Sequence, residues 1–480
     1  MESHRRILPQ EIALTRFCRN PASFRDPDAS VFHHGDRVLR AFQNAGKKRY
    51  DEFSASGLPE KWTAGGSLLP STPLSDEDRE RFAPGAPLLL EHPRIPFLSW
   101  CYEWSFEMLR AAALLELDLF LEALEKDFLL KDATPYNVQF RGTDPVHIDV
   151  TSFACREEGS PWLAYGQFCH LFLNPLLLSA STGIPFTSRL RGSLGGISPG
   201  ETRKLLPWYR RGIFLDVTLQ AWAQRSFSRS DSSLSRLKKE APVRRESLAR
   251  TGRRLRRIIH RLRRPNPGRG WSRYEDEKIY SAEGAEFKDA FVDRWCGSFA
   301  PSTVWDLGCN TGRYSRIAAR HADHVLAVDA SSETIDELFL DLRGEGNRTV
   351  QCLVMDLADP SPARGWAGRE REAFTDRGKP GLLLALALFH HLRIAAGIPL
   401  RESLPWMAKR AEKAILEFVP KEDRMARRLL QWREDIFDDY TAEGFESELK
   451  KSHRILERAA IPGTGRVLYA VEAEGQKSRR

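Results

Sequence analysis

The feature that most constrains the fold is a short apolar run beside an acid and a glycine-bounded turn. Residues 303–307 read Thr-Val-Trp-Asp-Leu, Gly308 to Gly312 follow at once, and a helix-forming stretch begins near Arg313. A strand, a tight turn and a helix start in this order lay a small charged ligand against helix N-terminal amides. Gly308 lets the backbone approach that ligand, and Gly312 lets the helix pack tightly. Asp306 adds a negative charge where a ligand ammonium group could sit.

A second apolar run also ends in an acid. The composition of Val325–Asp329 predicts a buried strand. An acid at the end of the second strand is placed to hold two ribose hydroxyls. We therefore expect Asp306 and Asp329 at the carboxyl edge of one parallel sheet.

The sequence 306–312, Asp-Leu-Gly-Cys-Asn-Thr-Gly, resembles the first motif of class I S-adenosyl-L-methionine (SAM)-dependent methyltransferases. A dinucleotide dehydrogenase would carry Gly-x-Gly-x-x-Gly instead, and an acid before the first glycine suits an amino-acid moiety better than a pyrophosphate. The chain also ends in an apparent hairpin, as the family's sheet does. The resemblance implies an α/β, Rossmann-like sheet with SAM as cofactor. It also implies the cofactor contacts, which are Asp306, Gly308, Asn310, Gly312, Asp329 and, at the adenine, Asp356 and Leu357.

The later strands follow the order that this resemblance implies. We expect them at Val350–Met355, Gly381–Leu388 and Lys413–Pro420, before the closing hairpin. His390 and His391 come directly after the fourth strand, where a doubly wound sheet places its reacting groups. A histidine there could accept a proton from an acceptor hydroxyl near neutral pH, so both are candidate catalytic residues. Structural capping of the loop is the alternative.

Other features near the expected acceptor pocket restrict the acceptor only in part. The Asp-Pro-Pro-Tyr type motif that marks methylation of amide or exocyclic amine nitrogens is absent from the sequence. Its absence argues against methylation of DNA or of glutamine. Tyr280 and Lys288 precede the sheet and could cover the cofactor, or could simply pack in the core.

The N-terminal half contains a second motif. A long helical pattern, Glu103–Phe128, leads into a loop with Asp132 and Asn137, and a turn and a strand then end at Asp149. The order and spacing resemble protein kinases and small-molecule phosphotransferases. The resemblance implies an α+β domain in which Asp132 takes a substrate proton while Asn137 and Asp149 hold Mg²⁺ against ATP.

This second motif departs from the kinase pattern in several ways. Lys131 stands where such loops usually carry His or Arg nearby, and Val-Thr-Ser follows Asp149 in place of Phe-Gly. The first hundred residues contain neither a glycine-rich phosphate loop nor a clear strand lysine with a glutamate partner. Three alternatives stay open: phosphate transfer, a degenerate scaffold that still grips a metal, nucleotide or acceptor, and simple turn hydrogen bonds.

A basic segment, residues 226–270, separates the two motifs. It carries much of the net charge of +8, and prolines and glycines close it, as in a domain linker. Its apolar residues predict a short amphipathic helix, with Leu255, Ile258, Ile259 and Leu262 on one face. Such a segment could contact RNA, an anionic membrane surface or an acidic partner. It could also be a solvated linker whose arginines pair with nearby acids.

The 480 residues are too many for one ordinary domain. We expect a kinase-like domain at 1–225, a linker at 226–270 and a methyltransferase domain at 271–480. Seven scattered cysteines, the lack of a signal peptide and the lack of a membrane-spanning apolar run predict a cytoplasmic protein.

The two motifs together resemble bacterial proteins related to the nodulation protein NoeA. The expected function is methyl transfer to a small-molecule or glycan-type acceptor. An RNA methyltransferase that uses the basic segment, and a bifunctional kinase/methyltransferase, are the alternatives.

Overall fold

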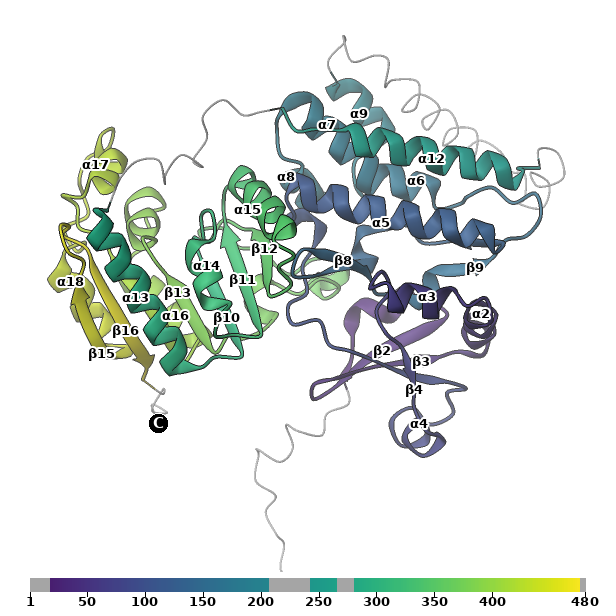
Figure 1. The fold of residues 1–480 in the computed structure, drawn as a ribbon, viewed down its shortest axis with the longest axis horizontal. Coiled ribbons are helices and arrows are strands. Elements are labelled where there is room, and N and C mark those ends of the chain that lie inside the picture. The colour runs from purple at the N-terminus through teal and green to yellow at the C-terminus, as the bar shows by residue number, and fades with distance from the viewer. Residues whose placement is uncertain (1–17, 207–241, 266–279, 475–480) are drawn as a thin grey trace, which may run out of the picture.

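The computed structural model describes residues 18–206, 242–265 and 280–474. They form an N-terminal half with a small sheet and several helices, and a C-terminal half around a larger sheet (Figure 1). The domain boundaries expected near 225 and 270 lie outside the described residues and stay predictions. Among the described residues, no helix combines the length and apolarity needed to cross a bilayer.

The C-terminal half contains the α/β sheet that the sequence predicts. Its strands lie in the order β12-β11-β10-β13-β14-β16-β15. β10 to β14 run parallel, and β16 is antiparallel to both of its neighbours. The strands are β10 (Thr303–Leu307), β11 (His324–Asp329), β12 (Val350–Val354), β13 (Leu382–Ala385), β14 (Lys413–Phe418), β15 (His453–Ala460) and β16 (Val467–Ala473). Because the strand order reverses at β10, a crevice is expected where β10 and β13 end.

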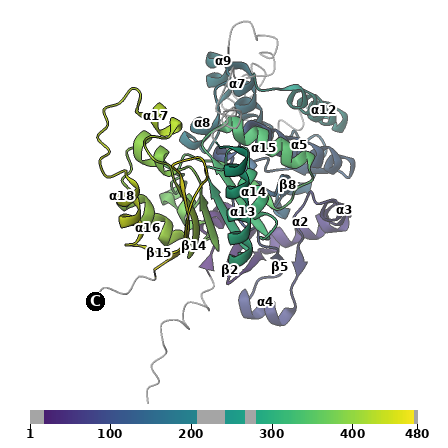
Figure 2. The same ribbon diagram turned by 60° about the vertical axis from the view of Figure 1, so that its left-hand side comes forward.

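Helices cover both faces of this sheet (Figures 1 and 2). Successive side chains of a strand point to opposite faces, so Val304 packs into one apolar cluster and Trp305 into the other. One layer contains α13 (Ala282–Phe299), α14 (Arg313–Ala318) and α15 (Ser332–Gly344), and the other contains α16 (Leu400–Arg410), α17 (Arg424–Leu430) and α18 (Ala442–Leu449).

The fourth strand is shorter than the sequence predicts. Gly381–Leu388 was expected to be extended throughout, but β13 ends at Ala385. Ala387 has a φ of 51°, a left-handed conformation that interrupts a strand. The chain then enters a π-helical turn, His391–Ala395, directly after His390.

The N-terminal half begins with a five-stranded antiparallel sheet in the order β1-β2-β3-β5-β4. Its elements are β1 (Cys18–Arg19), β2 (Ala29–His34), β3 (Arg37–Phe42), α2 (Asn44–Ala55), α3 (Leu58–Ala64), β4 (Thr72–Pro73), α4 (Asp76–Phe82) and β5 (Leu89–His92). The predicted long helix is α5 (Phe106–Glu125). It is followed by β6 (Phe128–Leu130), β7 (Val138–Arg141), β8 (Asp144–His147), β9 (Phe153–Cys155), α6 (Tyr165–Phe168), α7 (Asn174–Thr182), α8 (Thr187–Gly192) and α9 (Pro199–Leu205).

Part of the basic segment packs against the N-terminal half. Its helix α12 (Arg245–Arg261) lies along α5 and buries Leu255 and Ile259, two residues of the predicted apolar face (Figure 1). A Cβ at Gly252 would lie 2.9 Å from the Phe120 ring, so the two helices approach closely there. This stretch is a packed helix of the N-terminal half.

The two halves share a buried junction. The Glu103 and Arg377 side chains are each 1% exposed, and Arg377 Nη1 donates to Glu103 Oε2 at 2.7 Å. Phe97 packs edge-on against Trp305 of β10, with ring centres 5.6 Å apart. Asp336 of α15 accepts a hydrogen bond from the Glu107 amide in the first turn of α5. The halves therefore contact each other through buried polar and apolar side chains.

Candidate functional site

The loop after β10 has the conformation that its glycines permit. Gly308 and Gly312 both have a φ of 79°, and Asn310 between them has a φ of 48°. The amides of Gly308 and Cys309 donate to the Val328 carbonyl at 2.8 and 2.9 Å, which ties the loop to β11. A Cβ at Gly312 would lie 2.5 Å from Leu338 of α15. Gly312 therefore allows the loop to pack closely against that neighbouring helix.

Two acids flank this loop, Asp306, which is buried, and Asp329, which is partly buried. Asp306 is 2% exposed and accepts a 2.6 Å hydrogen bond from the Ser315 hydroxyl. Burial raises the pKa of Asp306 to about 6. At the end of β11, Asp329 accepts one bond on each oxygen, from the amides of Ser331 (2.8 Å) and Asn310 (3.0 Å). Each carboxylate oxygen has a second lone pair, so Asp329 can still accept from ligand hydroxyls.

The third acid follows β12. Asp356 is exposed and accepts a bond from the Ala358 amide at 2.8 Å, and Leu357 packs partly against the apolar core. Because β10, β11 and β12 are parallel neighbours, Asp306, Asp329 and Asp356 come at the same edge of the sheet. The topology brings the predicted cofactor residues to that edge.

His390 and His391 lie beyond β13, with ring centres 4.2 Å apart. His390 is 1% exposed, and within the described chain neither of its ring nitrogens has a hydrogen-bond partner. Burial, with His391 and Arg466 adding to it, holds the pKa of His390 well below its ordinary value. Burial also lowers the pKa of His391. His390 is therefore a neutral imidazole near pH 7, able to accept a hydrogen bond but weak as a base.

A buried polar cluster near this edge was only partly anticipated from the sequence. Glu417 of β14 accepts bonds from Lys288 Nζ (2.6 Å), from the Tyr280 hydroxyl (2.7 Å) and from Arg466 (3.3 Å). Although burial acts to raise it, the charges of Lys288 and Arg466 lower the pKa of Glu417. Tyr280 and Lys288 were candidates from the sequence. Glu417 was missed, although an acid inside an apolar strand was a readable signal.

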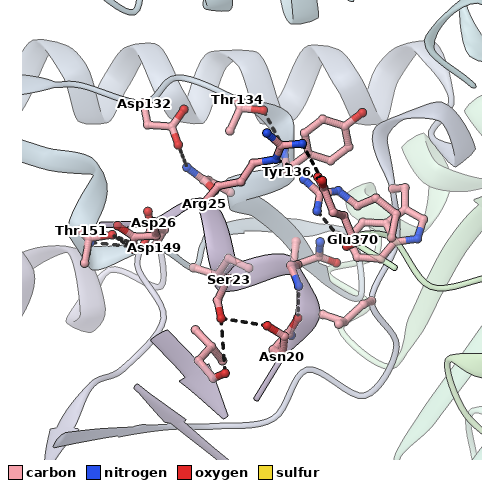
Figure 3. Close-up of a pocket in the computed structure, with 18 of the residues that line it drawn as sticks. Asn20, Ser23, Arg25, Asp26, Asp132, Thr134, Tyr136, Asp149, Thr151 and Glu370 are labelled. Atoms are coloured by element: carbon pink, nitrogen blue, oxygen red, sulfur yellow. Dashed lines mark hydrogen bonds and ion pairs between the residues drawn. The ribbon is translucent and has the colours of Figure 1, made fainter. Parts of the chain in front are cut away.

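The second motif lines a cavity of about 1990 Å³ in the N-terminal half (Figure 3). Asn137 Nδ2 donates to Asp132 at 3.2 Å and to Ser152 at 2.9 Å. Asp149 accepts 2.7 Å bonds from the Ser152 and Thr151 hydroxyls. Asp132, Asn137 and Asp149 therefore line one cavity.

Asp149 also has a cationic partner that the sequence analysis missed. Arg40 of β3 donates to Asp149 at 2.5 Å, and the Arg40 side chain is 8% exposed. Against the opposing effect of burial, Arg40 brings the pKa of Asp149 below its ordinary value. The sequence signal was an arginine inside the apolar run Val38–Phe42.

The metal prediction for Asn137 and Asp149 stays a prediction. In the described ranges, no group of three or more His, Cys, Asp or Glu side chains is arranged to hold a metal ion. Arg40, Thr151 and Ser152 already engage the oxygens of Asp149. Mg²⁺ would have to displace some of these donors.

Several arginines of the basic segment pair with acids of both halves. Arg256 of α12 bonds to Asp118 of α5, and Arg264 bonds to Glu333 and Asp336 of α15. Other arginines recur on one exposed side of α12, namely Arg250, Arg253, Arg257 and Arg261. An anionic partner at that side stays a prediction.

A sheet in this order, with a glycine loop and acids at its carboxyl edge, defines a class I methyltransferase fold in the C-terminal half. The nodulation protein NoeA of Rhizobium meliloti (strain 1021) is 36% identical over 466 residues, covering 95% of this chain and 96% of its own. The chain therefore belongs to the NoeA family. No family model matches the chain.

Other comparisons cover less of the chain. A 23S rRNA (uracil(1939)-C(5))-methyltransferase, RlmD of Methylococcus capsulatus (strain ATCC 33009 / NCIMB 11132 / Bath), is 32% identical over 81 residues, 17% of this chain and 18% of its own. Among solved structures, the N-methyltransferase NodS of Bradyrhizobium japonicum WM9 matches 41% of this chain and 99% of its own, with 15% identity and a TM-score of 0.31. The bifunctional kinase-methyltransferase WbdD matches 42% of each chain, with 18% identity and a TM-score of 0.30.

Proposed function

We propose that the C-terminal half is a SAM-dependent methyltransferase that acts on a small-molecule or glycan-type acceptor. The observation that carries the proposal is the edge at which Asp306, Asp329 and Asp356 lie at or just beyond the carboxyl ends of three neighbouring parallel strands, around the Gly308 loop. The first two of these acids fit the cofactor's chemistry. A carboxylate at Asp306 suits an ammonium group, and the spare lone pairs of Asp329 suit ribose hydroxyls.

In this proposal the protein acts mainly by alignment. SAM would supply a methyl group on a sulfonium, from which the sulfur departs readily as a neutral thioether, so an acceptor held in line gains most from orientation. Both ring nitrogens of His390 are buried, whereas His391 is only partly buried, so His391 is the one of the pair that can accept a hydrogen bond from an acceptor hydroxyl and so orient its oxygen lone pair. The Glu417 cluster bonds the neighbouring end of β14 to Lys288 of α13 and to Arg466.

The test of methyl transfer uses labelled SAM and a small-molecule extract of the source cells. The wild-type chain is expected to transfer label into that fraction, and Gly308→Arg should abolish the transfer because its side chain fills the loop's ligand-facing space. Comparing small molecules between wild-type and Asp306→Ala strains then identifies the acceptor. Label that enters RNA alone would replace the small-molecule acceptor with the RNA alternative.

The convergence of Asp132, Asn137 and Asp149 on one cavity favours a second candidate, phosphoryl transfer to a hydroxyl in the N-terminal half. In that candidate Asp132 accepts the hydroxyl proton, and Asn137 and Asp149 hold Mg²⁺. ATP with Mg²⁺ should raise the melting temperature of the wild-type chain but not of Asp149→Asn. A shift that is equal in both chains would contradict the metal role of Asp149.

A further inference from the structure

One wall of the N-terminal cavity comes from the methyltransferase half. The segment between β12 and β13 lines the cavity with Trp366, Glu370 and Arg371. Figure 3 shows Arg25 of the N-terminal half beside Glu370, and Arg25 Nη2 donates to Glu370 Oε1 at 2.7 Å. Glu370 is 8% exposed and also accepts from the Trp366 amide at 2.8 Å. The wall is thus held in place by contacts from both halves.

Within this wall, Arg371 has a guanidinium whose hydrogen bonds a ligand could complete. Its guanidinium lies 4.2 Å from the ring centre of Tyr136 and 5.4 Å from that of Trp100. Nη1 donates to the Glu370 carbonyl at 2.9 Å. Its Nε is buried but its Nη2 is not, and within the part of the chain that the structure describes neither nitrogen has an acceptor. A charged donor that lines a cavity without an acceptor can bond to a ligand oxygen, and Nη2 is the atom placed to do so.

The rest of the cavity carries both charges, with Arg40 and Lys131 lining it beside three carboxylates. Asp26 and Asp149 stand together with Thr151 away from this wall (Figure 3), and Asp132 lines the same cavity. Carboxylates accept hydrogen bonds from hydroxyl groups. Aromatic residues also line the cavity: Trp100 and Trp162 are buried, whereas Trp366 is 67% exposed and offers an apolar face on which a sugar ring can lie.

From this arrangement we propose that the cavity binds a phosphate ester of a sugar, free or within a nucleotide, and that Arg371 of the methyltransferase half receives its phosphate. The sugar hydroxyls then face the carboxylates, and the ring lies against the aromatic side chains. The site is complete only when both halves are folded together, because Arg371 and the carboxylates come from different halves.

The test is calorimetry on the full chain with Mg²⁺ present, using glucose 1-phosphate, UDP-glucose, ATP and inorganic phosphate as separate probes. At least one of the three sugar-containing probes should bind more tightly than inorganic phosphate. Arg371→Met should weaken that binding about tenfold or more, since it removes a charged hydrogen bond. The matched control is Arg343→Met, on exposed α15 surface outside the cavity.

The pattern among the probes identifies the source of the phosphate ester. Glucose 1-phosphate indicates a free sugar phosphate, and UDP-glucose or ATP indicates a nucleotide. Should Arg371→Met prove misfolded by circular dichroism, Trp366→Ala serves in its place, because Trp366 is 67% exposed and can be removed without opening a core. It too should weaken binding. Three results would overturn the proposal. None of the probes gives heat, inorganic phosphate binds more tightly than the sugar-containing probes, or neither variant changes the binding.

Discussion

The two halves each gather acids in one region, but they stabilise these acids differently. In the C-terminal half, Asp306 is buried and Asp329 partly buried, their described partners are a hydroxyl and backbone amides, and their pKa values are raised. In the N-terminal half, Arg40 neutralises Asp149, whose pKa is lowered. The C-terminal edge therefore holds charge that a cationic ligand could neutralise. The N-terminal cavity already holds a counter-charge of its own.

The largest loss of stability is expected on replacing Asp149. Changing Asp149→Asn leaves Arg40 buried without its counter-charge, which should destabilise the protein by about 3 kcal/mol at pH 7. The stabilisation from a lowered carboxyl pKa is present above the ordinary pKa and is lost as pH falls through the folded-state pKa. The difference between wild type and variant should therefore shrink in acid. Urea denaturation at several pH values measures it, and a variant as stable as wild type at pH 7 would contradict the pairing.

At Asp306, replacing the acid by asparagine is expected to raise stability at neutral pH. Its pKa is raised from 3.8 to about 6, so its ionisation at pH 7 costs about 3 kcal/mol of folding free energy. Stability from a raised carboxyl pKa is present below the ordinary value and is lost as pH rises through about 6. Asp306→Asn should thus be more stable than wild type at pH 7.5 but not at pH 4. Asp323 is exposed, so Asp323→Asn is the control and should leave stability unchanged at both pH values.

The smallest effect on stability is expected at Asp356. It is exposed and accepts only the local Ala358 bond that the structure records, so Asp356→Asn should change stability by less than about 0.5 kcal/mol. If it contacts adenine, the same variant should bind the demethylated cofactor several-fold more weakly. Unchanged binding would remove Asp356 from the predicted cofactor contacts and leave the other acids to carry the site.

Local signals explain what the sequence predicted correctly. Asp306, Gly308 and Gly312 lie within seven residues, so one motif predicts a strand, a turn and a helix start. Parallel strand order then places Asp329 and Asp356 beside them. Strand four was predicted too long because its apolar run continues past Ala385, whereas Ala387 adopts a left-handed conformation.

Distant contacts explain what the sequence could not predict. Glu417 meets Lys288 and Arg466 from separate elements, and hydrophobic periodicity says nothing about such pairing. Arg371 lines a cavity of the other half, and no local pattern near it indicates that position. Whether His390 and His391 act in catalysis, and whether Asn137 and Asp149 hold a metal, stay predictions.

Calorimetry with S-adenosyl-L-homocysteine on the full chain tests the central claim most directly. The wild-type chain should bind it, and Asp329→Ala should lose binding at least tenfold because a charged acceptor for the ribose hydroxyls is removed. The exposed Asp323→Ala, directly before β11, should bind as wild type does. Absence of heat with the wild-type chain, or equal binding by Asp329→Ala, would contradict a nucleoside site at this edge.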